Sequence, residues 1–286
     1  MSDQQTLPDS LLDMHGAIPP PVDLTPSLSI VFTRGANVGL FHGPDGVFII
    51  DSAFASDAPG ILANARDLGA PRLLVNTHWH HDHVTGNPHF TQHGIPIVAH
   101  ANTLARLSTP QYLSPLDYHI PPFEEAGLPT WTFTGDMSFR ANGDTMRLVH
   151  LPRAHSDGDL IVHFENANII MANDFFVPEE DLPFVDFDGD GNYMGFLRAI
   201  DRIIGMCDDE TVIVPGHARE MGTRADFVRF RDKVASMADR VARLRDAGKS
   251  IDELDGAALF REEYAGSAFP PDLYARMIYR SIEQDT

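Results

Sequence analysis

Residues 73–83 read Leu-Leu-Val-Asn-Thr-His-Trp-His-His-Asp-His, and this stretch carries most of the information about the fold. The run that begins at Leu73 is typical of a buried strand, and four side chains that can bind a metal follow it within six residues. A strand end is a rigid platform from which a turn can direct alternate side chains to one point. Neutral imidazole and carboxylate groups are both zinc ligands. Burying these polar groups together without a metal would cost on the order of several kcal/mol each, so the stretch predicts a metal site rather than a solvated loop.

The His-x-His-x-Asp-His spacing of residues 78–83 resembles the signature of the metallo-β-lactamase superfamily, and later motifs extend the resemblance. Each later motif contains one candidate ligand: Arg-Ala-His-Ser-Asp-Gly-Asp at 153–159 contains His155, Ile-Ile-Met-Ala-Asn-Asp at 169–174 ends in Asp174, and Thr-Val-Ile-Val-Pro-Gly-His at 211–217 ends in His217. The resemblance runs from about Ile30 to Glu220. Four separate motifs in the family's order make chance similarity a poor explanation.

The resemblance implies a role for each ligand. The first metal would take His78, His80 and His155, the second would take Asp82, His83 and His217, and Asp174 would bridge the two. The chain departs from the family at two places. The residue before the bridging acid is usually Gly, whereas this chain has Asn173. Many lactamases place a Cys at the position of Asp174, but the only cysteine here is Cys207, so the bridge resembles those of glyoxalase II, lactonases and other hydrolases of the superfamily.

Two metal ions explain why no Ser or Cys nucleophile is needed. Water held between two divalent cations loses a proton near neutral pH, and the same cations polarise a substrate carbonyl. A metal-bridging hydroxide is then the nucleophile, and Asp82 is the candidate catalytic residue that orients it and carries a proton to the leaving atom. The histidine-rich ligand set predicts two Zn²⁺ ions, while the oxygen ligand Asp174 would also suit iron or manganese.

The order of apolar patterns predicts an α/β fold, and the resemblance makes it a four-layer αβ/βα sandwich with extra C-terminal helices. We expect an N-terminal extension over 1–27, a catalytic domain over 28–222 and a helical segment over 223–286 packed on the same domain. Strands are predicted at 28–33, 38–42, 47–51, 73–76, 130–133, 138–140, 145–150, 160–164 and 168–171. Helices are predicted at 57–68, 87–93, 193–206, 223–247 and 251–264, with a last one after Pro270-Pro271.

Composition limits the partners. The formal net charge is −20 and the only lysines are Lys233 and Lys249, which argues against nucleic acid as a partner. No stretch approaches the roughly 20 apolar residues of a membrane span, so no membrane partner is expected. The N-terminus lacks the pattern of a signal peptide, which predicts a cytoplasmic protein, or a periplasmic one if a signal peptide was removed. A monomer or a homodimer is expected, with C-terminal aromatic residues as a possible dimer patch: Phe260, Tyr264, Phe269, Tyr274 and Tyr279.

Substrate contacts are expected from the segment after Asp174 and from nearby cations. The apolar side chains of Phe175, Phe176 and Phe184 could wall one side of the site, and His119 could reach it from a Pro-rich loop. A substrate carboxylate would have to be held by arginine, because no lysine lies between Asp174 and Asp232. The nearest candidates are Arg153, Arg198 and Arg219.

These features together predict a dinuclear zinc-dependent hydrolase that opens a cyclic amide or ester of a small molecule. A β-lactam-like substrate is the first hypothesis, and a lactonase or a glyoxalase II-like thioesterase is the alternative. A diiron redox protein is an alternative of a different class, although no second cofactor domain is visible in the sequence. Metal analysis and a panel of lactams, lactones and thioesters would separate these hypotheses.

Overall fold

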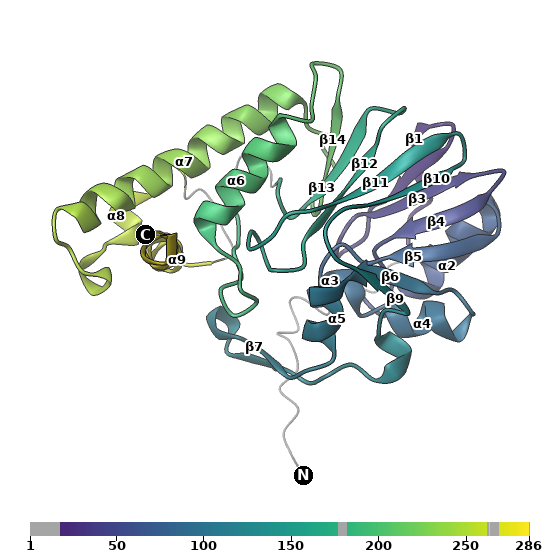
Figure 1. Cartoon of the computed structure of the whole chain (residues 1–286), viewed down its shortest axis with the longest axis horizontal. Coiled ribbons are helices and arrows are strands. Elements are labelled where there is room, and N and C mark those ends of the chain that lie inside the picture. Colours follow the sequence, from purple (N-terminus) through teal and green to yellow (C-terminus); the bar gives the residue numbers. More distant parts are fainter. Residues whose placement is uncertain (1–17, 177–181, 262, 264–268, 286) are drawn as a thin grey trace, which may run out of the picture. The chain divides into compact units, whose positions relative to one another are not determined.

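Short apolar strands form two main sheets in a mixed α/β fold (Figure 1), which confirms the predicted fold class. The computed structural model describes residues 18–176, 182–261, 263 and 269–285. The chain divides into two units, Met1–Met146 and Arg147–Thr286. This division falls inside the catalytic domain predicted for 28–222, whose behaviour as one domain stays a prediction.

The first unit is built on a seven-stranded sheet. Its order along the sheet is β1 (Val22–Thr25), β2 (Leu28–Val31), β3 (Val38–Gly43), β4 (Gly46–Ile50), β5 (Pro71–Val75), β6 (Ile97–His100) and β9 (Trp131–Phe133). The strands from β1 to β4 pair antiparallel, and those from β4 to β9 pair parallel. The parallel strands therefore end at the same edge, and β5 ends there at Val75, three residues before His78, the first histidine of the 78–83 motif.

Helices cover one face of this sheet. They are α2 (Ala58–Leu68), α3 (His81–Val84), α4 (Asn87–Gln92) and α5 (Ala101–Leu107). The buried face of α2, which includes Ile61 and Leu62, packs with Leu40 and Ile49 of the sheet in one apolar cluster. Burial of this face stabilises the first unit by roughly 25 cal/mol for each Å² of apolar surface removed from water. This packing holds β4 and β5, the strands that lead into the ligand-bearing turns.

The second sheet has five strands. Its order is β10 (Met137–Ala141), β11 (Asp144–His150), β12 (Leu160–Phe164), β13 (Ile169–Asn173) and β14 (Val212–Pro215), and the boundary between the units falls inside β11. In the second unit β12 and β13 pair antiparallel, while β13 and β14 pair parallel. Because β13 and β14 run side by side and in the same direction, Asp174 and His217 follow strand ends at the same edge.

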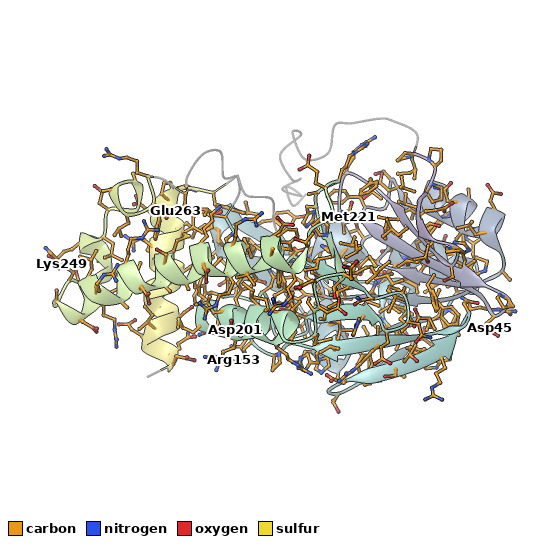
Figure 2. All side chains as sticks on the ribbon, turned by 90° about the horizontal axis from the view of Figure 1, so that it is seen from above. Asp45, Arg153, Asp201, Met221, Lys249 and Glu263 are labelled. Atoms are coloured by element: carbon orange, nitrogen blue, oxygen red, sulfur yellow. The ribbon has the colours of Figure 1, made fainter. Side chains whose placement is uncertain are left out.

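The C-terminal helices belong to the core of the second unit. α6 (Tyr193–Ile204), α7 (Arg224–Asp246) and α9 (Pro271–Asp285) contribute to one apolar cluster with the strands, and Figure 2 shows Lys249 beyond the end of α7. Phe260 and Tyr274 are fully buried in this cluster. The side chains of these two residues are thus packed inside the unit and offer no surface to a dimer partner. Tyr264 lies outside the described residues.

The helix predicted for 251–264 is wrong. Residues there form the short turn η3 (Ile251–Glu253) and α8 (Gly256–Leu259), separated by Leu254 in an extended conformation. A Cβ at Gly256 would lie 2.4 Å from the carbonyl of Pro271. The close approach of these two segments, together with the cap that Asp255 provides to α8, accounts for the break.

Other elements escaped prediction. β1 lies in the predicted N-terminal extension, and β6 and α5 were not foreseen. The Pro-rich loop expected around His119 instead contains the hairpin of β7 (Gln111–Leu113) and β8 (Tyr118–Ile120), with the short turns η1 (Ser114–Leu116) and η2 (Glu125–Gly127) nearby. Among the residues that the structure describes, no helix is both long and apolar enough to cross a membrane.

Candidate metal centre

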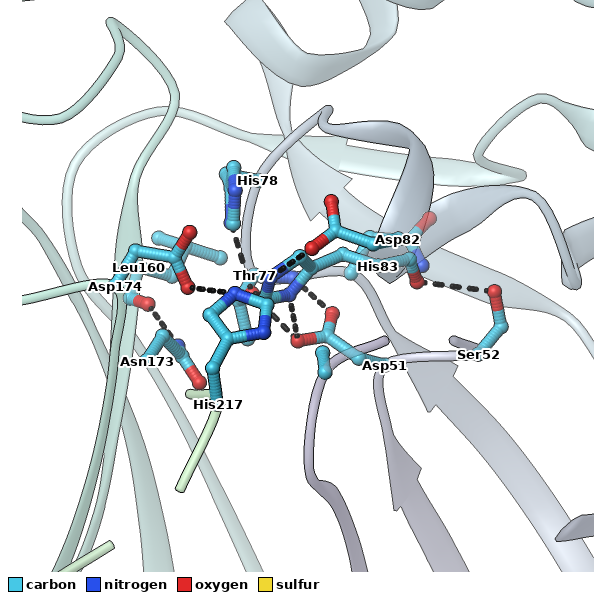
Figure 3. A network of polar contacts seen from close by, with 12 residues as sticks. Asp51, Ser52, Thr77, His78, Asp82, His83, Leu160, Asn173, Asp174 and His217 are labelled. Carbon is cyan, nitrogen blue, oxygen red and sulfur yellow. Dashed lines mark hydrogen bonds and ion pairs between the residues drawn. The ribbon is translucent and has the colours of Figure 1, made fainter. Parts of the chain in front are cut away.

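His83, in the first unit, is held in one orientation by a buried carboxylate. Its Nδ1 lies 2.8 Å from Oδ2 of Asp51, and both side chains are fully buried (Figure 3). A carboxylate only accepts hydrogen bonds, so Nδ1 of His83 must carry the proton and Nε2 is left with its lone pair. A histidine that donates one nitrogen to a carboxylate and offers the other is the usual arrangement of a metal-binding imidazole.

Asp51 is placed by the backbone that follows β4. Its φ is +64°, a left-handed conformation that is uncommon for a residue other than glycine. The carboxylate also accepts hydrogen bonds from the backbone N–H and the hydroxyl of Thr77, at 2.8 and 2.6 Å. These bonds join the end of β4 to the turn after β5. The strained backbone at Asp51 is thereby offset by a buried network that positions His83.

The turn after β5 directs the other ligands of the first unit. His80 is extended and caps α3, so the chain changes direction there and a single helical turn carries Asp82 and His83. His78 and His80 offer nitrogen atoms within 4.8 Å of each other, and Asp82 and His83 offer an oxygen and a nitrogen within the same distance. Each pair is therefore close enough to share one ion.

Asp82 is the accessible member of this set. Its side chain is 29% exposed, whereas that of His83 is fully buried. The main-chain carbonyl of Asp82 accepts a hydrogen bond from the N–H of Ala36 at 3.0 Å. A Cβ at Gly35 would lie 2.6 Å from that carbonyl oxygen, so only glycine allows the turn between β2 and β3 to approach this closely.

Trp79 and His81 lie between the candidate ligands of the motif, and both side chains pack against other residues of the first unit. Trp79 is buried and packs with Val84, Leu107 and Ile120. His81 contacts the rings of Tyr118 and Phe123, and burial lowers its pKa to about 4. His81 is therefore neutral at pH 7 and packs as an uncharged ring against aromatic side chains.

His155, in the second unit, is anchored to the main chain rather than to a side chain. Its Nδ1 donates to the carbonyl oxygen of Phe184 at 2.9 Å, and its own carbonyl accepts from the N–H of Asp186 at 2.8 Å. A carbonyl oxygen cannot donate, so Nδ1 carries the proton and Nε2 keeps its lone pair. The segment around Phe184 thus fixes both the ring and the backbone of His155.

Asp174 is approached by two histidines, one at each oxygen. Nε2 of His155 lies 3.3 Å from Oδ2 of Asp174, and Nε2 of His217 lies 3.1 Å from Oδ1. Two electron-rich atoms this close repel unless a proton or a cation lies between them. Two ligands about 2.1 Å from one ion and separated by a tetrahedral angle lie about 3.4 Å apart, which is close to both distances. The donor set of the second unit therefore fits a carboxylate shared between metal ions.

Asn173 lies directly before the candidate bridging acid Asp174, at a position where the family usually has glycine. Its φ is +48°, in the left-handed region that asparagine tolerates better than most residues. Its side-chain amide donates to the carbonyl of Leu160 at 2.7 Å, and its carbonyl accepts from the N–H of Gly216 at 2.9 Å. Asparagine can thus serve here in place of glycine while linking three ligand-bearing segments of the second unit.

The three phenylalanines that were proposed to contact substrate have different surroundings. Phe175 is buried and stacks on Phe196, and Phe176 packs against Phe227 and Phe230. Both rings therefore contribute to the core. Phe184 is half-buried, with its ring centroid 6.0 Å from that of His155. Residues 177–181 of the same segment lie outside the described residues.

The proposed cationic contacts differ in their surroundings. Arg198 forms a two-pronged ion pair with Asp285, Arg153 lies 3.7 Å from Asp190, and all three arginines, Arg219 included, have exposed side chains. His119 is exposed on β8 and stacks on Tyr112. Contact of these four residues with a substrate stays a prediction.

Sequence reasoning missed the residues that orient the ligands. Asp51 and Thr77 were not proposed, and the anchor of His155 is a main-chain atom of Phe184 that no residue type reveals. The signal that could have found Asp51 is its position: an acid directly after the apolar strand that pairs with β5.

Comparisons with known proteins agree with this geometry. The profile of the metallo-beta-lactamase superfamily matches residues 31–217. A search of curated proteins found no match. Among solved structures, a metallo-beta-lactamase from Pontibacter korlensis is 15% identical with a TM-score of 0.62, covering 75% of this chain and 98% of its own. The B3 metallo-beta-lactamase BLEG-1 is 19% identical with a TM-score of 0.57, covering 73% and 95%.

A sulfatase has a similar fold as well. The inverting sec-alkylsulfatase Pisa1 from Pseudomonas sp. is 16% identical with a TM-score of 0.64, and the match covers 91% of this chain but only 50% of the sulfatase. At such low identities, these TM-scores show a similar fold and nothing further. The profile match spans more than half of the chain, and the chain belongs to the metallo-β-lactamase superfamily. Members of this superfamily are metal-dependent hydrolases, and the histidines and aspartates described above could bind a metal.

Proposed function

We propose that this chain is a metal-dependent hydrolase in which the ligand sets of the two units combine in one dinuclear zinc centre. The proposed first site consists of His78, His80 and His155, the second of Asp82, His83 and His217, and Asp174 is shared. The observation that carries the proposal is the placement of one histidine nitrogen at each oxygen of Asp174, at 3.3 and 3.1 Å. The proton positions on His83 and His155 support it, since each leaves Nε2 as the free donor.

Bound divalent cations would supply activated water and would polarise the bond to be cleaved. The residues of the chain have two further tasks. Asp51 and the carbonyl of Phe184 keep His83 and His155 in the tautomer that binds a metal. The partly exposed carboxylate of Asp82 would accept a proton from the attacking water and deliver it to the leaving atom.

We propose a small cyclic amide or ester as the substrate, with a β-lactam first and a lactone or thioester second. A substrate carboxylate would be held by one of three arginines of the second unit, Arg153, Arg198 or Arg219, because no lysine lies between Asp174 and Asp232. The net charge of −20 would disfavour polyanions such as nucleic acids. A sulfate ester is a further candidate, because the alkylsulfatase fold matches more of this chain than the lactamase folds do.

A substrate panel with and without a chelator tests the proposal. Nitrocefin, a γ-lactone, a thioester and a secondary alkyl sulfate would be offered to the purified protein, to chelator-treated protein and to treated protein with zinc restored. We expect hydrolysis of at least one of these four substrates that is lost on chelation and recovered with zinc. Turnover that survives complete metal removal, or turnover of none of the four classes, would contradict the proposed hydrolase.

Asp82→Asn tests the proposed proton carrier. We expect most turnover of any accepted substrate to be lost, by roughly 10²–10⁴-fold, while the circular dichroism spectrum stays that of the wild type. The amide keeps the shape of the side chain but cannot accept the proton. Activity near that of the wild type would remove Asp82 from the mechanism.

A further inference from the structure

Phe269, in the segment between α8 and α9, stacks on Phe184 in the second unit. The two ring centroids are 4.9 Å apart and the rings are inclined by 21°, and both side chains are half-buried. The ring of Phe184 in turn meets the edge of the His155 ring at a centroid distance of 6.0 Å. Phe269, which lies 114 positions after His155, is thus linked to it through one aromatic side chain. The superfamily profile ends at residue 217, so it assigns no role to Phe269.

The segment that carries Phe184 is fixed on both sides. Leu182 and Val185 are buried in the core of the second unit, and the hydroxyl of Tyr274 donates to the carbonyl of Leu182 at 3.4 Å. On the other side, the N–H of Asp186 donates to the carbonyl of His155 at 2.8 Å. The main chain at Phe184 is therefore held in place, and its partly exposed ring has a defined position beside His155.

Phe184 and Phe269 differ from the other aromatic residues of this region. Phe175 is almost fully buried, and Phe176 packs on Phe227 and Phe230. Among the described phenylalanines between 175 and 184, Phe184 is the one whose ring meets a candidate metal ligand. Its stacking on Phe269 creates a continuous apolar surface from two side chains that still have exposed area. We call Phe184 and Phe269 the aromatic pair.

We propose that the aromatic pair is an apolar subsite that binds the alkyl or acyl chain of the substrate, and that Phe269 is a specificity-determining residue. The inference rests on the proposed hydrolase, and it narrows the substrate class to esters or amides with an extended apolar group. Each buried methylene contributes about 0.8 kcal/mol, so a chain of several carbons laid on these rings would raise affinity measurably. A short acyl group would not reach Phe269 and would gain nothing from it.

Two p-nitrophenyl esters, the acetate and the octanoate, test the proposal with Phe269→Ala and Phe269→Leu. We expect Phe269→Ala to raise KM for the octanoate about tenfold and to leave kcat/KM for the acetate within about twofold of the wild type. Phe269→Leu should restore much of the loss, because it returns apolar area without the ring. Phe187→Ala is the matched control: Phe187 is a half-buried phenylalanine that packs against the same core. Its removal should affect both esters equally.

Equilibrium binding separates this inference from the proposed hydrolase. Titration calorimetry with decanoate and butyrate measures chain binding without turnover. We expect Phe269→Ala to weaken decanoate binding about tenfold and butyrate binding little, with an unchanged metal content. Equal losses for the long and short probes, or a Phe187→Ala variant with the same selective loss, would overturn the subsite. If the substrate panel shows no metal-dependent hydrolysis but decanoate binding still depends selectively on Phe269, the hydrolase proposal fails and the subsite stands.

Discussion

His83 in the first unit and His155 in the second have the same proton arrangement but different anchors. His83 donates to the carboxylate of Asp51, whose backbone is strained, whereas His155 donates to the main-chain carbonyl of Phe184. A carboxylate forms the stronger, charge-assisted bond and can be removed by one substitution. A carbonyl cannot be removed, so the position of His155 depends on the packing of the segment that carries Phe184. The first unit should therefore be sensitive to single polar substitutions, and the second to changes in packing.

The largest effect is expected where a ligand has no substitute. Asp174→Ala removes the carboxylate that both His155 and His217 approach, and we expect activity to fall by about a thousandfold or more, because several kcal/mol of metal-assisted stabilisation are lost. Steady-state kinetics with any accepted substrate measures the change. Asp174→Glu keeps the charge and should retain part of the activity. A variant that turned over normally would show that Asp174 is not a ligand.

Asp51→Asn breaks the side-chain anchor in the first unit. We expect a 10–100-fold loss of metal affinity, because the amide cannot hold His83 in the same tautomer with a charge-assisted bond. Competition with a chelating dye measures the affinity. Thr77→Val is the comparison variant, since it leaves the bond between Asp51 and His83. It removes the 2.6 Å hydrogen bond to Asp51 and the longer contacts of the Thr77 hydroxyl with Nδ1 of His78 and His83, at 3.3 and 3.4 Å. It should lower the free energy of unfolding by about 1 kcal/mol with a smaller change in metal affinity. Equal effects of both variants on metal affinity would show that Asp51 is not needed to orient His83 for metal binding.

Gly216→Ala tests the sensitivity of the second unit to packing. The new Cβ would lie 2.5 Å from Oδ1 of Asp174 and 2.8 Å from the carbonyl carbon of Asn173, so the bridging acid must move. We expect about a hundredfold loss of activity, because displacing a catalytic group by about 1 Å has effects of this size. Gly205→Ala is the control, since its Cβ would meet its nearest neighbours only at 3.4 and 3.5 Å. Similar activity of the two variants would mean that the approach of Gly216 to Asp174 is not required.

The smallest effect is expected at the surface. Arg219→Ala should weaken binding of a β-lactam with one carboxylate by about 1 kcal/mol or less and leave a neutral lactone unaffected, because an exposed cation is screened by solvent. Comparison of KM for the two substrates measures it. Arg153→Ala and Arg198→Ala test the other two candidates with the same pair of substrates. A selective loss in Arg198→Ala alone would transfer the role to that residue.

The candidate ligands could be predicted from the sequence because each lies in a short motif that follows an apolar strand, as His78, His155 and His217 do. Their anchors could not. Asp51 acts across 32 residues on His83 through a backbone conformation that residue type does not disclose, and Phe184 acts through a carbonyl that every residue possesses. Contacts between distant segments also overrode a helix that local periodicity predicted.

The segment 251–264 shows how such contacts decide local structure. Its helical periodicity is broken where Gly256 approaches Pro271, a contact that no short window of sequence contains.

The aromatic residues after Asp174 were expected to act as a group, but Phe175 and Phe176 face the core while Phe184 lies beside His155. Packing decides which of these rings are buried, and residue type alone does not show it.

Elemental analysis of the protein, purified without added metal, tests most directly the claim that the ligands of both units form one dinuclear centre. We predict about two metal equivalents per chain, with zinc dominant, as expected for seven ligands arranged around two ions. A reproducible single equivalent, or iron in place of zinc, would contradict the dizinc centre.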